Sequence, residues 1–345
     1  MIDENSRIEL TGTADDQEDS ILARILASSE ASVTAAAAAL RAGLLVAFPT
    51  ETVYGLGAVA TLDSAVESIY RAKRRPAFNP LIIHLAKLDQ LGDIAIIDDL
   101  ARRAVAAFWP GPLTVVLRSS PSSPVVARAR GGLDSVAARM PADPLARALL
   151  LATGVPVAAP SANPSGRVSA TTAAHVAEDL GSAVDLVLDG GPSRLGVEST
   201  VLDLRNSDRP RVLRPGAIAS DIIAIELGVV LPYSADPGEI SSPGQLANHY
   251  APSKALRLEA RHVERDEALL AFGPSIPDGA IKTSNLSPSG DLAEAAHNFF
   301  AMLRDLDKSP AIRIAAMPIP SIGLGIALND RLRRAAAPRG STQCG

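Results

Sequence analysis

The sequence predicts an α/β fold, and three observations support this prediction. Short apolar runs typical of buried strands alternate with segments of helical periodicity, which is the pattern of α/β proteins. The chain has 345 residues, of which 47% are hydrophobic, enough for two domains with separate cores. Residues 229–252 have no periodicity and are longer than an ordinary loop. We therefore expect a larger α/β domain, a linker and a smaller α/β domain.

The elements of the larger domain follow from local composition. Residues 21–42 are rich in alanine and favour a helix, which Gly43 would end. Residues 63–75 place apolar side chains at helical spacing, with Asp63 or Ser64 as the cap. Further helices are predicted at residues 98–108, 144–153 and 171–181. Strands are predicted at residues 44–48, 81–85, 113–117, 135–139, 155–159, 186–189 and 200–204.

Residues 54–60, Y-G-L-G-A-V-A, have the G-x-G-x-x-A spacing of a dinucleotide-binding loop. The acidic residue that would bind the ribose about 20 residues further on is missing, because residues 73–82 contain neither Asp nor Glu. The G-x-x-x-x-G-K-[ST] phosphate-binding motif is also absent from the sequence. We therefore interpret residues 54–60 as a plain turn between a strand and a helix.

The second half of the chain begins with residues 229–252, which we expect to serve as both linker and lid. The smaller domain is indicated by strands at residues 269–272 and 312–316 and by a helix at residues 291–306. Asp291 and Glu294 have the spacing of a capping pair at the start of this helix.

Composition limits the classes of function. Aromatic residues make up only 3% of the chain, which argues against a stacking platform for single-stranded nucleic acid. The net charge of -5 gives no general attraction for phosphate backbones, so contact with RNA is left open. The single Cys344 cannot form an internal disulfide, and no uncharged apolar run reaches the ~18 residues of a membrane span. We expect a cytoplasmic protein, away from membranes, with a disordered acidic tail at residues 1–25.

Polar side chains gather where predicted strands and helices end. The run P-T-E-T-V-Y directly follows the strand at residues 44–48, as a binding loop would. Four cations lie within residues 71–75, where a helix C-terminus favours them but a polyphosphate would also relieve their mutual repulsion. Arg139 ends an apolar strand, and such a charge needs a carboxylate or phosphate partner. Ser161 and Asn163 follow a buried strand, at the end where α/β sheets bind ligands; an ordinary turn is the alternative.

Metal cages and nucleophile motifs are absent from the sequence. The five histidines show neither H-E-x-x-H nor Cys/His spacing, and no G-x-S-x-G elbow occurs. No metal ligands are therefore assigned. A divalent ion would instead enter with a nucleotide, held by phosphates and water.

Six motifs occur in order: P-T-E-T-V-Y-G-L-G, K-R-R-P-A-F-N-P-L-I-I-H, F-W-P-G-P-L-T, A-P-S-A-N-P-S-G, G-V-E-S-T-V-L-D and L-R-P-G-A. Together they closely resemble the YrdC-like family over residues 30–218. The segments S-P-G…H-Y-A-P and G-L-G-I-A-L-N-D-R-L-R-R-A-A further resemble its two-domain members, the threonylcarbamoyl-AMP synthases. The resemblance implies a YrdC-like twisted mixed sheet with helices at 26–228, a linker and lid at 229–252, and a Rossmann-like α/β domain at 253–345.

The family's activity is also implied by the resemblance. L-Threonine and bicarbonate form N-carboxy-threonine, whose carboxylate attacks the α-phosphorus of ATP, accompanied by Mg²⁺. Pyrophosphate leaves, and the threonylcarbamoyl-adenylate passes to a downstream transferase that modifies tRNA. Such a reaction needs alignment and charge neutralisation more than a protein nucleophile.

Residue roles carry over motif by motif. The K-x-R pair, Lys73 and Arg75, matches the family's catalytic cations and would hold ATP phosphates. The residues implied to bind ATP are Arg75, Asn79, Ser135, Asn163, Thr171, Arg214 and Tyr250. The residues implied to bind threonine are Thr52, His84, Arg139, Ser161 and Ser199. Arg139 would take the threonine carboxylate as a two-pronged fork.

The chain departs from the family in one motif and at Ser135, where relatives commonly have Thr, and two other functions remain open. The linker reads S-P-G-Q-L-A-N-H-Y-A-P, where relatives typically have S-P-G-M-K-Y-R-H-Y-A-P. One alternative is a module that binds double-stranded RNA or tRNA without catalysis. Another is carbamoyl transfer as in hydrogenase maturation, which the absence of acylphosphatase and zinc-finger segments disfavours.

Overall fold

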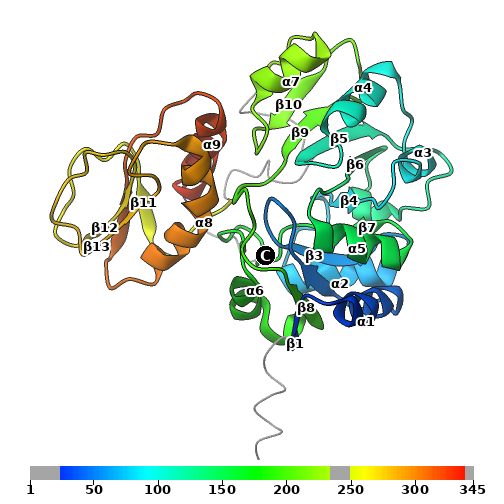
Figure 1. Ribbon diagram of the computed structural model, residues 1–345, viewed down its shortest axis with the longest axis horizontal. Helices are drawn as coiled ribbons and strands as arrows, with labels where there is room; N and C mark the ends of the chain where they lie inside the picture. Colours follow the sequence, from blue (N-terminus) through cyan, green and yellow to red (C-terminus); the bar gives the residue numbers. More distant parts are fainter. Residues whose placement is uncertain (1–23, 234–248, 339–345) are drawn as a thin grey trace, which may run out of the picture.

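A computed structural model describes residues 24–233 and 249–338 of the chain (Figure 1). The larger of its two sheets is mixed, with the strand order β1-β8-β2-β3-β7-β4-β6-β5-β9-β10. Its strands are β1 (Arg24–Ala27), β2 (Val46–Phe48), β3 (Gly55–Val59), β4 (Ile82–His84), β5 (Leu113–Arg118), β6 (Ser135–Arg139), β7 (Val157–Ala158), β8 (Leu186–Asp189), β9 (Thr200–Asp203) and β10 (Arg211–Arg214). The α/β class and the mixed sheet predicted from the sequence are confirmed.

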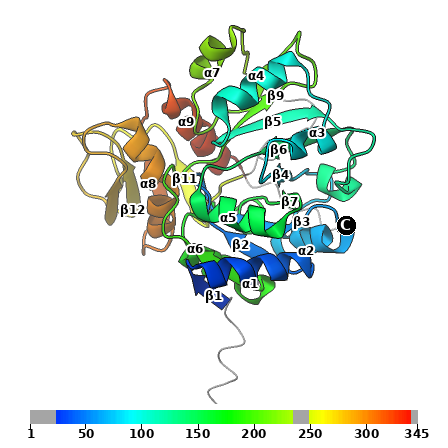
Figure 2. The same cartoon turned by 45° about the vertical axis from the view of Figure 1, so that its right-hand side comes forward.

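Helices cover both faces of this sheet. They are α1 (Glu30–Arg41), α2 (Asp63–Lys73), α3 (Gln90–Ile94), α4 (Asp99–Phe108), α5 (Pro144–Thr153), α6 (Ala173–Leu180) and α7 (Ser220–Leu227). Strand β2 shows the two-sided burial, because Val46 and Phe48 pack with α1 and α5 whereas Ala47 belongs to the core under α2, α4 and α6. Figure 2 shows α1 and α5 next to each other on their face.

The helix predicted at residues 21–42 is wrong in its first turns. Residues Arg24–Ala27 instead form β1, which pairs in parallel with β8 at the edge of the sheet. The helix begins after Ser29, whose side chain accepts a hydrogen bond from the backbone N–H of Ser32. Alanine content predicts helix strongly, but pairing with a distant strand overrides it at this end. Residues 1–23 of the predicted tail lie outside the described part, and its last two residues, Arg24 and Ile25, belong to β1 instead.

The predicted end of helix α2 matches the structure, but its predicted N-cap does not. Neither Asp63 nor Ser64 caps it: the N-cap position is Leu62, which makes no side-chain capping bond. At the other end Arg74 adopts a left-handed conformation, with φ of 50°. This conformation ends the helix just before Pro76.

The segment interpreted as a turn at residues 54–60 is a strand, and that interpretation was wrong. Strand β3 is antiparallel to both of its neighbours, β2 and β7. A Cβ on Gly57 would lie 2.8 Å from the ring of Phe48, so glycine is what allows this ring to lie flat over the strand. The glycines therefore serve close packing rather than a phosphate-binding loop.

The smaller sheet has the order β11-β14-β12-β13, and every pair in it is parallel. Its elements are β11 (Ala255–Arg257), β12 (Glu267–Ala271), β13 (Lys282–Asn285), α8 (Leu292–Asp307), β14 (Arg313–Ala316) and α9 (Leu324–Ala335). Asp291 caps α8 by accepting from the backbone N–H of Glu294, as the spacing predicted. Leu303 of α8, fully buried, belongs to the core of this unit.

The two units meet through α8 and α9, which lie between the sheets in Figure 1. Arg304 of α8 forms an ion pair with Asp179 of α6 and donates to the backbone carbonyl of Ser169 at 3.1 Å. Arg331 of α9 pairs with Glu198 at 3.0 Å, and no part of the Arg331 side chain is exposed. Buried charges of this kind require partners, so the contact between the units depends on specific pairs of side chains.

Predicted elements match best where periodicity and end signals agree. The strands at 135–139 and 186–189 and the helix at 144–153 have the bounds found in the structure. Strands β10, β11 and β13 and helices α3, α7 and α9 were not predicted. Of the predicted linker and lid, residues 234–248 lie outside the described part. Within that part no helix is long and apolar enough to cross a membrane.

Replacing Leu56 with alanine should lower the free energy of unfolding by about 2–5 kcal/mol. Leu56 is fully buried at the centre of the large sheet, so its loss would leave a cavity. Leu151→Ala on the surface of α5, where the side chain is 47% exposed, should cost less than about 0.5 kcal/mol. Urea unfolding followed by circular dichroism measures both changes, and equal losses would contradict this account of the core.

Candidate functional site

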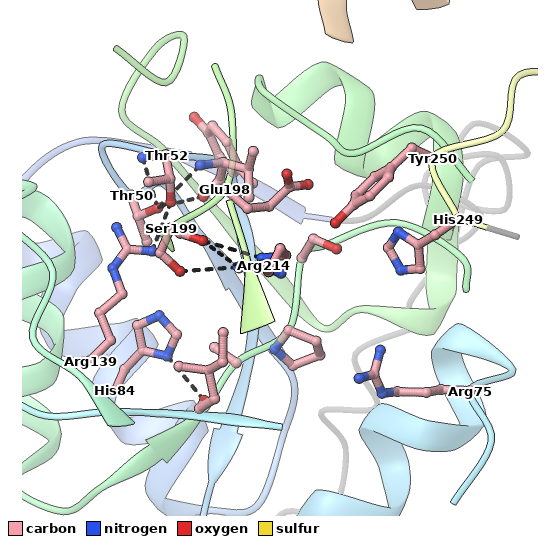
Figure 3. A pocket seen from close by; sticks show the side chains of 17 residues that line it. Thr50, Thr52, Arg75, His84, Arg139, Glu198, Ser199, Arg214, His249 and Tyr250 are labelled. Carbon is pink, nitrogen blue, oxygen red and sulfur yellow. Dashed lines mark hydrogen bonds between the residues drawn. The ribbon is translucent and has the colours of Figure 1, made fainter. Parts of the chain in front are cut away.

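A small pocket lies among the ends of several strands of the large sheet, and its cavity volume is about 40 Å³. It is lined by Thr50, Thr52, Val53, Tyr54, Gly55, Arg75, Ile82, His84, Arg139, Ala159, Pro160, Ser161, Glu198, Ser199, Arg214, His249 and Tyr250. In Figure 3, Arg139 and His84 lie at one end, and Arg75, His249 and Tyr250 lie at the other. The pocket thus joins two groups of polar side chains contributed by distant parts of the sequence.

Arg139, the last residue of β6, is held from three sides. Its Nη2 lies 2.6 Å from Oε1 of Glu51, and its Nη1 donates to Oγ1 of Thr52 at 2.8 Å. Its Nε donates to the carbonyl of Gly111 at 3.2 Å. Burial raises the pKa of Glu51, but the charge of Arg139 together with backbone N–H groups close to the carboxylate outweighs burial and leaves the pKa below its usual value. Both partners are therefore charged in a buried ion pair.

His84 lies beside Arg139, because β4 and β6 are parallel neighbours and both end here. Its Nδ1 lies 3.2 Å from the carbonyl of Ile82, which fits a neutral ring whose Nδ1–H donates. Burial, followed by repulsion from Arg139, lowers the pKa of His84 to about 3. The imidazole is therefore neutral at physiological pH, with Nε2 as an acceptor.

Arg214, at the end of β10, lies between the two ends of the pocket. Its Nη2 donates to the carbonyl oxygen of Ser199 at 2.9 Å and to the Ser199 hydroxyl at 3.1 Å. The Ser199 hydroxyl also lies 2.7 Å from Oγ1 of Thr114. A Cβ on Gly216 would lie 2.3 Å from the backbone of Ser199, so glycine permits the close approach of these two segments.

The four cations at the end of α2 divide into two outward and two inward side chains. Arg71 and Arg74 are exposed, whereas Lys73 and Arg75 are buried. Nζ of Lys73 donates to the carbonyl oxygens of residues 161 and 163, and Nη2 of Arg75 donates to the carbonyl of Pro80 at 2.8 Å. Burial and the charge of Arg75 hold the pKa of Lys73 well below its usual value. Burial also lowers the pKa of Arg75 to about 10. A bound anion would offset the unfavourable burial of both positive charges.

His249 and Tyr250 fill the end of the pocket near Arg75. Tyr250 is fully buried with φ of 65°, and its ring lies 5.7 Å from that of Phe300. The guanidinium of Arg331 lies 5.1 Å from the Tyr250 ring centre, a cation–π contact. Burial, with repulsion from Arg75 next, holds the pKa of His249 well below its usual value. The two rings thus join the smaller unit to the pocket.

Several buried polar atoms near this end have no hydrogen-bond partner among the described residues. They are Nδ2 and Oδ1 of Asn79, Oδ1 of Asn163, Nδ1 of His249 and the hydroxyl of Tyr250. Buried polar atoms are normally paired, because leaving one unpaired costs about 1–3 kcal/mol. Their occurrence beside buried cations indicates that a polar anionic ligand belongs here.

The structure brings together eight of the thirteen side chains predicted for the site. These eight line the pocket: Thr52, Arg75, His84, Arg139, Ser161, Ser199, Arg214 and Tyr250. Five do not line it: Lys73, Asn79, Ser135, Asn163 and Thr171. Asn79 and Asn163 lie directly behind it, in contact with Arg75 and Lys73. Thr171 contacts Nδ1 of His175, and Ser135 lies at the opposite end of β6 from Arg139.

Several polar residues of the site, including Thr50 and Tyr54 in the pocket lining, had no role predicted from the sequence. Glu198 and His249 line the pocket, Glu51 supports Arg139, and Arg331 pairs with Glu198. Glu51 lies between Thr50 and Thr52, and Glu198 directly precedes Ser199 and Thr200. These neighbouring hydroxyl residues could have indicated both carboxylates. Nothing local could have found Arg331. In the described ranges, no three His, Cys, Asp or Glu side chains form a group able to hold a metal.

Family models match the chain in two adjoining parts. The model Sua5_yciO_yrdC, described as telomere recombination, matches residues 38–216. A second model, described as the threonylcarbamoyl-AMP synthase C-terminal domain, matches residues 219–337. The chain belongs to the Sua5/YciO/YrdC family. It combines that family's main domain with the second domain of the synthases, as the sequence motifs predicted.

Relatives within the Sua5/YciO/YrdC family are similar over nearly their whole length. The threonylcarbamoyl-AMP synthase of Pyrococcus abyssi is 42% identical over 88% of this chain and 94% of its own. That of Bacillus subtilis is 38% identical over 91% of this chain and 95% of its own. The crystal structure of P. abyssi Sua5 complexed with L-threonine has a TM-score of 0.83 at 38% identity, covering 91% of this chain and 97% of that one.

Lowering the pH should destabilise the protein through His84. Folding lowers the pKa of His84 from 6.5 to about 3. Below pH 6.5 the His84 imidazole therefore binds a proton in the unfolded chain but stays neutral in the folded chain, which favours unfolding. Between pH 7.5 and 5 this effect should remove about 2 kcal/mol of the free energy of unfolding.

Over the same pH range, the free energy of unfolding of the His84→Gln variant should fall by about 2 kcal/mol less than that of the wild type. His262→Gln, at an exposed position, should keep the wild-type dependence. Urea unfolding at a series of pH values measures the difference. Parallel curves for wild type and His84→Gln would contradict the buried neutral imidazole.

Proposed function

We propose that the protein is a threonylcarbamoyl-AMP synthase, a nucleotidyltransferase. It combines L-threonine, bicarbonate and ATP into threonylcarbamoyl-AMP, releasing pyrophosphate and water. The observation that carries this proposal is the pocket itself. The guanidinium of Arg139, which suits a carboxylate, lies at one end, and a group of buried cations around Arg75 lies at the other. Two further observations support the proposal. The crystal structure of P. abyssi Sua5, which contains bound L-threonine, has a TM-score of 0.83 to this structure. The threonylcarbamoyl-AMP synthases of P. abyssi and B. subtilis are 42% and 38% identical to the chain.

Threonine occupies the end of the pocket at Arg139. The guanidinium binds its carboxylate, and Thr52, Ser161 and Ser199 offer hydroxyl groups to its polar atoms. His84 is neutral, so its free Nε2 accepts a hydrogen bond instead of adding a charge. This end supplies orientation, which places the N-carboxylate of the intermediate for attack on ATP.

ATP occupies the end at Arg75. Lys73 uses two of its three N–H donors on backbone carbonyls, so the third is available to a phosphate oxygen. Arg75 and Arg214 neutralise the charge that develops as pyrophosphate leaves. The unpaired amide of Asn79 and the unpaired Oδ1 of Asn163 add polar contacts to the nucleotide. Ser135 and Thr171 are assigned to ATP as well, although neither lines the pocket in the described conformation.

The described conformation has no room for ATP. A cavity of about 40 Å³ is far smaller than the roughly 300–1,000 Å³ of small-molecule sites. His249 and Tyr250 fill the space beside Arg75, so ATP binding requires these two rings to move. We therefore propose that residues 249–250 cover the nucleotide during the reaction.

Mg²⁺ enters with ATP as the metal of the triphosphate. The site fits it, because the buried Oδ1 atoms of Asn79 and Asn163 are oxygen donors without partners in the described residues. When bound, the ion neutralises phosphate charge. The protein's share of the work is to hold and orient the phosphates through Lys73, Arg75 and Arg214.

The wider setting of the enzyme follows from its product. Threonylcarbamoyl-AMP is a mixed anhydride that needs a transferase to use it before water does. We propose that this transferase modifies tRNA in the cytoplasm and that the chain divides at 26–228, 229–252 and 253–345. The alternative, a module that binds double-stranded RNA without catalysis, leaves the buried cations and the Arg139 fork without a purpose.

Pyrophosphate release should require ATP, threonine and bicarbonate together. We expect omission of any one of them to abolish turnover, because the attacking carboxylate exists only after threonine and bicarbonate combine. A coupled pyrophosphate assay with each substrate left out in turn measures this. ATP turnover that ignores threonine would refute the proposed function.

Substitutions at the two ends should separate the two substrates. Arg139→Gln should raise the KM for threonine by at least about 30-fold while the KM for ATP changes less than about threefold. Arg75→Gln should do the reverse. Arg71→Gln, on the exposed side of the same helix, should match the wild type. Similar effects of Arg139→Gln and Arg75→Gln on both substrates would contradict the division of the pocket.

A further inference from the structure

Glu51 is the charged partner of Arg139, yet it is not part of the pocket surface. The two side chains are 3% and 4% exposed, and the distance between Oε1 and Nη2 is 2.6 Å. Thr52, the next residue, lines the pocket, whereas Glu51 does not. A group in this position does not bind substrate directly. It acts through Arg139.

We propose that Glu51 determines specificity by neutralising Arg139 before substrate arrives, so that the site prefers a zwitterionic α-amino acid to a simple carboxylate. This inference rests on the proposed function, since it concerns the threonine end of the pocket. It gives Glu51 the role of selecting substrates by their charge.

The geometry leaves Arg139 able to bind a carboxylate while Glu51 stays in place. A guanidinium has five N–H donors. Within the described residues, one is donated to Gly111 and one to Thr52, whereas Nη2 contacts Glu51 as an ion pair that lacks hydrogen-bond geometry. One N–H on Nη1 and both on Nη2 therefore have no hydrogen-bond partner there, and a carboxylate fork needs one N–H from each of two nitrogens. Glu51 therefore holds the guanidinium without competing for that fork.

The charges then favour a zwitterion. Arg139 and Glu51 sum to zero, and a bound zwitterion keeps the sum at zero. A carboxylate without an amino group would leave one negative charge beside Glu51 in a buried site, where charge interactions are strong. His84 adds no charge, because it is neutral. Two further carboxylates lie near the pocket. Asp143 accepts from the backbone N–H of Ala146 and faces the positive end of the α5 dipole, and Glu198 lines the pocket but is paired with Arg331 at 3.0 Å.

The test compares threonine with (R)-3-hydroxybutyrate, which is threonine without its amino group. Calorimetry measures the binding of each ligand to the full chain in the absence of ATP, so no turnover is needed. Wild type should prefer threonine. In Glu51→Gln the affinity for (R)-3-hydroxybutyrate should rise at least about tenfold while that for threonine changes less than about threefold. A variant that merely damaged the fold would bind nothing more tightly.

Two further variants complete the experiment. Glu51→Asp keeps the charge and should keep the wild-type preference, and Glu67→Gln, at an exposed position on α2, should do so as well. An unchanged ratio of the two affinities in Glu51→Gln, or equal weakening of both ligands, would overturn the inference. If wild type bound no threonine, the proposed function itself would fail, so the two failures are distinguishable.

Discussion

The burial of positive charge in one cleft is the constraint on which the rest of the site depends. An ammonium or guanidinium taken out of water needs acceptors, and here backbone carbonyl groups supply most of them. Lys73 uses the carbonyls of residues 161 and 163, Arg75 uses that of Pro80, and Arg214 uses that of Ser199. Carbonyl groups satisfy the donors without cancelling the charge. The cleft therefore stays electropositive at the nucleotide end, whereas a carboxylate makes the Arg139 end neutral.

The sheet explains why residues far apart in the sequence reach this cleft. His84 and Arg139 end adjacent parallel strands, and Ser199 and Arg214 flank the antiparallel pair β9 and β10. Strand pairing fixes these relative positions within the register of the sheet, which is more precise than a loop alone would be. Gly216 then permits the segment after β10 to approach Ser199. The position of each charge thus follows from backbone pairing before any ligand binds.

Local sequence signals account for much of the fold and for most of the pocket. Helix α5 could be predicted in full, because Asp143, Pro144 and Gly154 mark its two ends. The inward pair of cations could be predicted only through the K-x-R motif, since four neighbouring charges look alike in sequence. Strand β3 was missed because its glycines indicate a turn until the ring of Phe48 is placed over them. Pairs such as Arg331 with Glu198 depend on tertiary contact across more than a hundred residues. The residues next to each of them in the sequence therefore give no signal of the pairing.

Neighbouring residues of α9 contact both sides of the segment 234–248. Asp330 accepts from the hydroxyl of Tyr233 at 2.8 Å, and Arg331 lies against the ring of Tyr250. The two attachment points are consecutive residues of one helix, which fixes the positions of Tyr233 and Tyr250 relative to each other. Because one helix holds both tyrosines, any shift of α9 would move the two attachment points together.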